Sequence, residues 1–107
     1  MSDTDRSLIP TELQRLADLE ATPHAQVFDE PKTVRLRLEA GEGVPAHRHP
    51  GREIVCHVLE GRLTIALGDD EREVAAGEVV RFDGEQEIAP TAQVDSTALL
   101  VLAPRAD

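Results

Sequence analysis

The sequence predicts an all-β fold, either a sandwich or a small barrel, preceded by a short N-terminal helix. Short segments rich in β-branched residues recur along the chain, and turn signals separate them. Their regular spacing, with turns such as 67–71 and 76–77, favours this fold over a parallel α/β fold. At 107 residues the chain fits one domain. We therefore expect an N-terminal segment at 1–24 and one barrel domain at 25–107.

The expected elements can be placed in order along the chain. The helix is expected within Pro10–Glu20, where Leu13, Leu16 and Leu19 recur at three-residue spacing and Pro10 suits a first turn. Because this stretch is short, we expect it to pack on the outside of the domain or on a partner. Strands are expected at residues 25–28, 33–38, 44–47, 53–59, 62–67, 72–75, 78–82, 88–92 and 97–102.

The last of these strands contains an apolar run at 99–102 without polar alternation. Such a run predicts a strand that is covered on both faces. It is either a sheet edge hidden at a subunit interface or a strand in the middle of the core. The first alternative leads us to expect a homodimer.

Acidic residues dominate the charged composition, with 21 Asp and Glu against 11 Lys and Arg and a formal net charge of −10. Lys32 is the single lysine of the chain. This bias resembles that of proteins adapted to high salt, where screening makes dense like charge tolerable, and an acidic mesophile has a similar bias. Because such a surface repels phosphates, we expect neither nucleic acid nor an anionic membrane as a partner.

The cysteine content and the N-terminus bear on the compartment. Cys56 is the single cysteine, so it cannot form a disulfide within the chain, and its place in an apolar strand favours a role as a small core residue. The first residues, 1–6, lack a positively charged start followed by a long apolar segment. We therefore expect a cytoplasmic protein.

Two histidines one residue apart are the strongest chemical signal in the sequence. If the segment is extended, His47 and His49 point to the same face, because side chains alternate along a strand. Two neutral imidazoles on one face can bind one metal ion, whereas Arg48 between them points away. A pair of surface or packed histidines is the alternative.

The surroundings of this pair resemble a known family. The order Gly41, five residues, His47, one residue, His49, three residues and Glu53, followed by an apolar strand that ends at Gly61, resembles the first motif of the cupin superfamily. The segment 76–84 is similar to the start of the second motif. The resemblance covers 34–102 and implies a double-stranded β-helix, the jelly-roll barrel of cupins, with a divalent ion (Fe, Mn, Zn or Ni) at its mouth.

The chain departs from the family pattern at the two other metal ligands. One residue too many separates Glu53 from Gly61. Either a β-bulge absorbs the extra residue and Glu53 faces the metal, or the strand is regular and Ile54 replaces the carboxylate. Glu87 stands where the family has its third histidine, and it is either a carboxylate ligand or a solvated charge of an acidic turn.

Two further residues are candidates for the cavity rather than for the metal. His57 enters the cavity only in the bulged register, and Arg52 at the rim can clamp a substrate carboxylate or form a surface ion pair. The resemblance implies a metal-dependent dioxygenase or isomerase acting on a small oxygenated molecule. The alternatives are a non-catalytic barrel that binds or senses a small ligand or metal, and a degenerate barrel without metal. Because only two aromatic residues occur, we expect an aliphatic or polar ligand.

Overall fold

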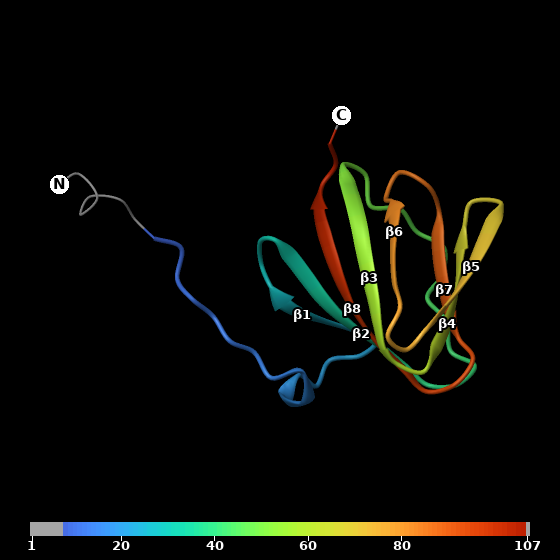
Figure 1. Cartoon of the computed structure of the whole chain (residues 1–107), viewed down its shortest axis with the longest axis horizontal. Coiled ribbons are helices and arrows are strands. Elements are labelled where there is room, and N and C mark those ends of the chain that lie inside the picture. The colour runs from blue at the N-terminus through green and yellow to red at the C-terminus, as the bar shows by residue number, and fades with distance from the viewer. Residues whose placement is uncertain (1–7, 107) are drawn as a thin grey trace.

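The computed structural model describes residues 8–106, which form two antiparallel sheets that face each other (Figure 1). One sheet has five strands in the order β1-β2-β8-β3-β6, and the other has three strands in the order β5-β4-β7. The all-β jelly-roll prediction is therefore confirmed. The strands are β1 His24–Phe28, β2 Lys32–Leu38, β3 Arg52–Glu60, β4 Arg62–Leu67, β5 Asp70–Ala75, β6 Val79–Asp83, β7 Ile88–Ala92 and β8 Ser96–Pro104.

The core lies between the two sheets and follows the period-two alternation of the strands. In β3, for example, Ile54, Cys56 and Val58 are buried, while the residues between them are partly exposed. β8 lies between β2 and β3. The apolar run 99–102 therefore belongs to a central strand and not to a sheet edge, which corrects the first of the two interpretations of that run.

The strand expected at 44–47 is not formed as a continuous strand. This segment makes isolated bridges to β7, at Gly43 with Thr91 and at His47 with Ile88. Pro45 lies between the bridges and has no N–H group to donate, so a regular ladder cannot run through it. The segment nevertheless stays attached to β7 on one side of the barrel mouth.

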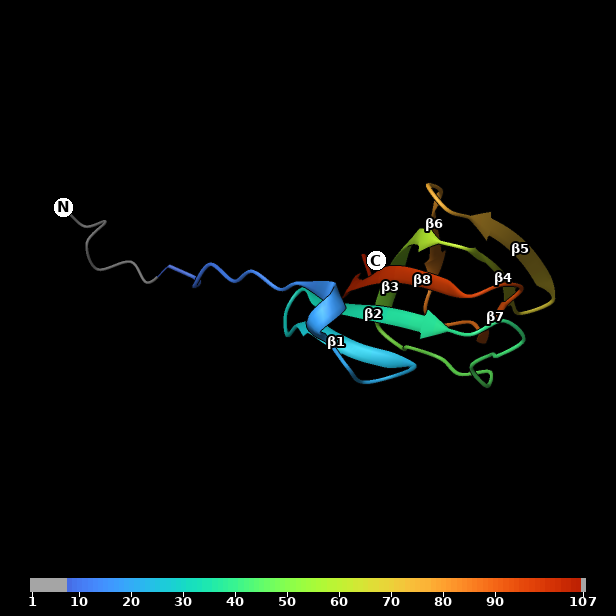
Figure 2. The same cartoon turned by 90° about the horizontal axis from the view of Figure 1, so that it is seen from below.

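The helix expected at 10–20 is reduced to one 3-10 turn, Leu16–Asp18, with no buried residue. A short helix needs tertiary packing of its apolar side, and Leu13 is instead 89% exposed. The described residues before the turn extend away from the barrel (Figures 1 and 2). Arg35 of β2 attaches the turn to the barrel, because its guanidinium donates hydrogen bonds to the carbonyl oxygens of Leu16, Leu19 and Ala21.

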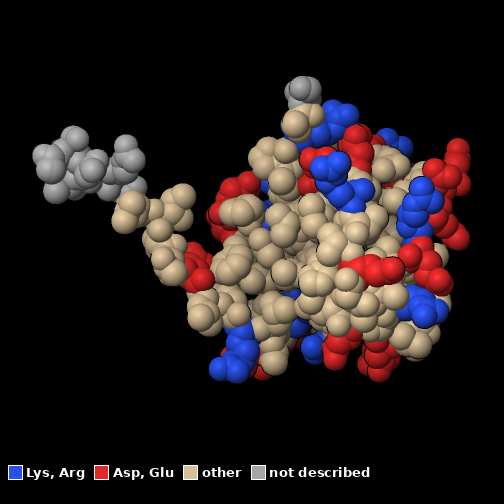
Figure 3. All heavy atoms as spheres, in the orientation of Figure 1, with Lys and Arg blue, Asp and Glu red and all other residues tan. Residues whose placement is uncertain are grey.

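The surface is rich in carboxylates. Acidic side chains outnumber basic ones in the chain, and Figure 3 shows them spread over the visible face, chiefly around the rims of the barrel. Between residues 8 and 106, no helix has the length and hydropathy needed to cross a bilayer.

Candidate functional site

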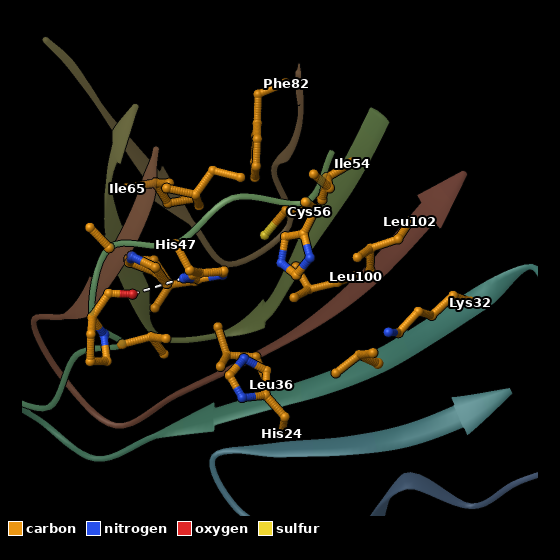
Figure 4. A pocket seen from close by; sticks show the side chains of 18 of the residues that line it. His24, Lys32, Leu36, His47, Ile54, Cys56, Ile65, Phe82, Leu100 and Leu102 are labelled. Carbon is orange, nitrogen blue, oxygen red and sulfur yellow. Dashed lines mark hydrogen bonds between the residues drawn. The ribbon is translucent and has the colours of Figure 1, made fainter. Parts of the chain in front are cut away.

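A cavity of about 630 Å³ lies between the two sheets, and residues of β1 and β2 line part of its wall (Figure 4). This volume falls within the range of small-molecule sites. Most of the wall is aliphatic. Its apolar side chains include Val34, Leu36, Ile54, Leu63, Ile65, Phe82, Ile88, Leu100 and Leu102.

Cross-strand rows of side chains build the wall on the five-stranded sheet. Lys32 of β2 pairs with Leu102 of β8, which pairs with Ile54 of β3, which pairs with Phe82 of β6. Directly paired residues of antiparallel strands share a face of the sheet, so these four side chains form one row that faces the cavity. The row has an ammonium group at one end and apolar side chains over the rest of its length.

His47 and His49 both line this cavity, and their ring centroids lie 4.8 Å apart in an edge-to-face arrangement. Backbone hydrogen bonds hold the segment in place: His47 N donates to Ile88 O at 3.1 Å, and His49 N donates to Gly84 O at 2.8 Å. Gly84 allows the close approach, because a Cβ there would overlap the carbonyl oxygens of His49 and Arg52. Arg48 points away and donates to Glu85 O.

The tautomer of His47 follows from its hydrogen bond. Its Nδ1 lies 2.8 Å from the carbonyl oxygen of Pro45. A carbonyl oxygen only accepts, so Nδ1 carries the hydrogen and the lone pair of the neutral ring is on Nε2. The ring therefore offers one acceptor nitrogen for a ligand.

The register of β3 places Ile54, and not Glu53, in the cavity. The strand pairs regularly with β6 and β8 from Glu53 onward, and the bulge lies later, between Val58 and Glu60. Ile54 is 2% exposed and lines the cavity. Glu53 is on the outer face, with its carboxylate 3.5 Å from the guanidinium of Arg81.

The other three candidates also lie outside the cavity wall. Glu87 is exposed, just before β7, and its carbonyl oxygen accepts a hydrogen bond from Gly68 N. His57 shares the outer face of β3, where it pairs with Leu99. Arg52 donates to Leu102 O at 2.7 Å and to the carboxylate of Glu30 at 3.2 Å, so its guanidinium has partners at the rim.

Three polar residues in the cavity lining had no assigned role in the sequence. His24 and Gln26 of β1 and Lys32 of β2 all line the cavity. The alternation of polar and apolar residues could have identified His24, because the exposed His24 and Gln26 of β1 alternate with the buried Ala25 and Val27. The strand was expected to begin at residue 25, one residue too late to include this histidine.

Three ionisable groups of the cavity, His24, His49 and Cys56, are shifted toward their neutral forms. Burial lowers the pKa of His49, and the nearby His47, Lys32, His24 and Arg52 lower it further. The pKa of His24 is lowered by burial and by His47. Burial raises the pKa of the Cys56 thiol to about 12, so without a metal ion beside it this thiol is protonated at neutral pH and is not an activated nucleophile.

These residues do not assemble the metal site that the family pattern implies. In the described part of the chain, no group of three or more His, Cys, Asp or Glu side chains is placed to hold a metal ion. The histidine pair lacks its third donor, because Ile54 stands at the position of the first carboxylate and Glu87 is outside the wall. Two imidazoles in an aliphatic cavity do not make a facial triad.

Two facing antiparallel sheets around a histidine-bearing cavity define a small jelly-roll barrel. Residues 34–103 match the family described as "Cupin domain", and the chain therefore belongs to the cupin family. No curated protein matches the sequence.

Solved structures share the fold. TT1209 from Thermus thermophilus is 25% identical, with a TM-score of 0.72 over 90% of this chain and 100% of that chain. KdgF from Halomonas sp. is 18% identical, with a TM-score of 0.70 over 84% of this chain and 90% of that chain. An uncharacterized protein with a double-stranded β-helix domain from Klebsiella pneumoniae is 14% identical, with a TM-score of 0.77 over 89% of this chain and 91% of that chain.

Proposed function

We propose that this cupin binds a small aliphatic molecule with a polar end in the cavity of its barrel and does not depend on a resident metal ion. The observation that carries the proposal is the position of Ile54. An aliphatic side chain stands beside the histidine pair, where a metal site of this fold needs a carboxylate. The pair is thereby suited to hydrogen bonding with a ligand.

The composition of the wall supports the class of ligand. Phe82 is the one phenylalanine among the described residues that line the cavity, so a flat aromatic ligand has few rings on which to stack. The aliphatic side chains offer a larger contact surface. His47, whose Nε2 lone pair is available, accepts a hydrogen bond from a hydroxyl or protonated group of the ligand.

Metal-dependent dioxygenase or isomerase chemistry is the second candidate. It is favoured by the hydrogen bond from His47 Nδ1 to Pro45 O, because metal-binding histidines usually donate their other ring nitrogen in this way. In that case His47 and His49 hold the ion, and Glu53 and Glu87 become ligands only if the backbone around them rearranges.

Elemental analysis together with calorimetry separates the two candidates. The protein is purified without a histidine tag, and its bound metal is measured. A panel of short aliphatic carboxylates, alcohols and amides is then titrated into the parent, into a His47→Ala/His49→Ala variant and into a His57→Ala variant. His57 is the matched control, because it lies on the outer face of β3.

We expect substoichiometric metal in the parent and binding of at least one compound class. The double variant should bind that class about tenfold more weakly, whereas His57→Ala should bind as the parent does. Near-stoichiometric metal that is lost only in the double variant would establish the second candidate instead. A parent that binds neither metal nor any compound would contradict both and leave the degenerate barrel.

A further inference from the structure

The cavity has one cationic side chain, Lys32, without a compensating acid. Its lining also includes three histidines, and no Asp or Glu occurs among the described residues of the wall. This contrasts with the whole chain, whose formal net charge is −10. A lone ammonium group in a mainly apolar cavity favours an anionic partner, because the low local dielectric strengthens the attraction.

Lys32 is available for such a partner. It is half-buried at the start of β2, and within residues 8–106 its ammonium group makes no hydrogen bond and no ion pair. Figure 4 shows its side chain reaching from β2 toward the cavity. The positive charge of Lys32 also helps to lower the pKa of His49, because both side chains border the same cavity.

The position of Lys32 within its row sets the geometry of a ligand. The next side chains in the row, Leu102 and Ile54, are apolar, and they belong to the next two strands of the sheet. Neighbouring strands are about 4.8 Å apart, so Ile54 lies about 10 Å across the sheet from Lys32. A molecule with a charged end and an aliphatic body of a few carbons fits this row.

We infer that the ligand is an aliphatic carboxylate, whose charged end is bound by Lys32 and whose body lies along Leu102 and Ile54. This inference rests on the proposed function and specifies its ligand class. The compact ammonium group of lysine, with three rotatable donors, suits a carboxylate at the end of a flexible chain. His24 and Gln26, on the neighbouring strand β1, border the mouth through which the ligand enters.

A matched pair of probes separates the contribution of the ligand's charge from that of its carbon chain. Hexanoate and hexanol have the same carbon chain, and each is titrated calorimetrically into the parent, Lys32→Met and Arg37→Met. Methionine keeps much of the lysine volume without its charge. Arg37 is the matched control, because it is an exposed cation on the same strand, with the opposite parity.

We expect hexanoate to bind the parent more tightly than hexanol does. Lys32→Met should weaken hexanoate binding by about tenfold, leave hexanol binding unchanged and remove the dependence of hexanoate affinity on salt, whereas Arg37→Met should change none of these. Equal affinity of the two probes, with no effect of Lys32→Met, would overturn the inference and leave the proposed function intact. If neither probe binds, the inference is overturned as well, and the wider panel and metal measurement decide the proposed function separately.

Discussion

At the scale of single residues, Arg35 is the least expected feature of the chain. It is 0% exposed, and its partners are three backbone carbonyl oxygens in place of a carboxylate. Its Nε has no partner in the described part of the chain, and burial lowers its pKa, although a guanidinium stays protonated at neutral pH. The contribution of Arg35 to the stability of the folded chain therefore depends on its hydrogen bonds to the N-terminal turn.

Replacing Arg35 should release that turn. Arg35→Met keeps most of the buried volume but removes all three donors, so we expect the free energy of unfolding to fall by about 1–3 kcal/mol in urea titrations. Hydrogen exchange at 16–21 should become faster. Arg37→Met, an exposed neighbour on the same strand, should change neither quantity. Unchanged exchange at 16–21 in Arg35→Met would show that other contacts hold the turn.

At the scale of the element, the parity of β3 decides which side chain stands beside the histidine pair. The bulge between Val58 and Glu60 comes after the site, so it leaves Ile54 facing inward and Glu53 facing outward. A shift of one residue would exchange them. The chemistry of the cavity therefore depends on where one extra residue is accommodated.

A single substitution tests this register. Ile54→Glu should place a carboxylate beside His47 and His49, and we expect its affinity for Zn²⁺ or Mn²⁺ to exceed that of Ile54→Gln by about tenfold or more. Burying the new carboxylate should destabilise the metal-free variant by about 2 kcal/mol, and added metal should raise the melting temperature of this variant alone. Equal metal affinity of the Glu and Gln variants would contradict the inward position of residue 54.

At the scale of the whole molecule, the N-terminal arm, here residues 8–15, extends away from the barrel (Figures 1 and 2). Leu8, Ile9 and Leu13 are 83%, 89% and 89% exposed. The outer face of the five-stranded sheet offers an apolar surface of half-buried side chains that includes Val55 and Val101, which pair across β3 and β8. In a dimer, the outer face of the five-stranded sheet of one copy can cover the apolar arm of the other copy.

We therefore predict a homodimer held in part by the arms. Burying each Leu or Ile contributes about 1.5–3 kcal/mol, so light scattering after gel filtration should give about twice 11.7 kDa for the parent. A variant with serine at positions 8, 9 and 13 should shift toward the monomer. The control is a Val94→Ser variant, because this side chain is 50% exposed in the bend between β7 and β8, outside the five-stranded sheet. A monomeric parent at high concentration would contradict the prediction.

Much of the fold was predictable from local patterns. Branched segments separated by turn signals identified eight of the strands to within one or two residues, and the order of Gly41, His47, His49 and Gly61 led to the family. The strand at 44–47 and the N-terminal helix were over-predicted. Pro45 interrupts the ladder in the first case, and in the second no tertiary contact covers Leu13.

The candidate site, like the fold, was only partly predictable from local patterns. Alternation alone predicted that His47 and His49 share a face, because this property belongs to a local extended segment. Which of Glu53 and Ile54 faces the cavity depends on the pairing of β3 with β6 and β8, because that pairing decides where the bulge falls. The sequence by itself thus determined the barrel, its acidic surface and the histidine pair. Only the tertiary structure decided what stands beside that pair, because residues distant in the chain, such as Lys32 and His24, reach the cavity only when the sheets close.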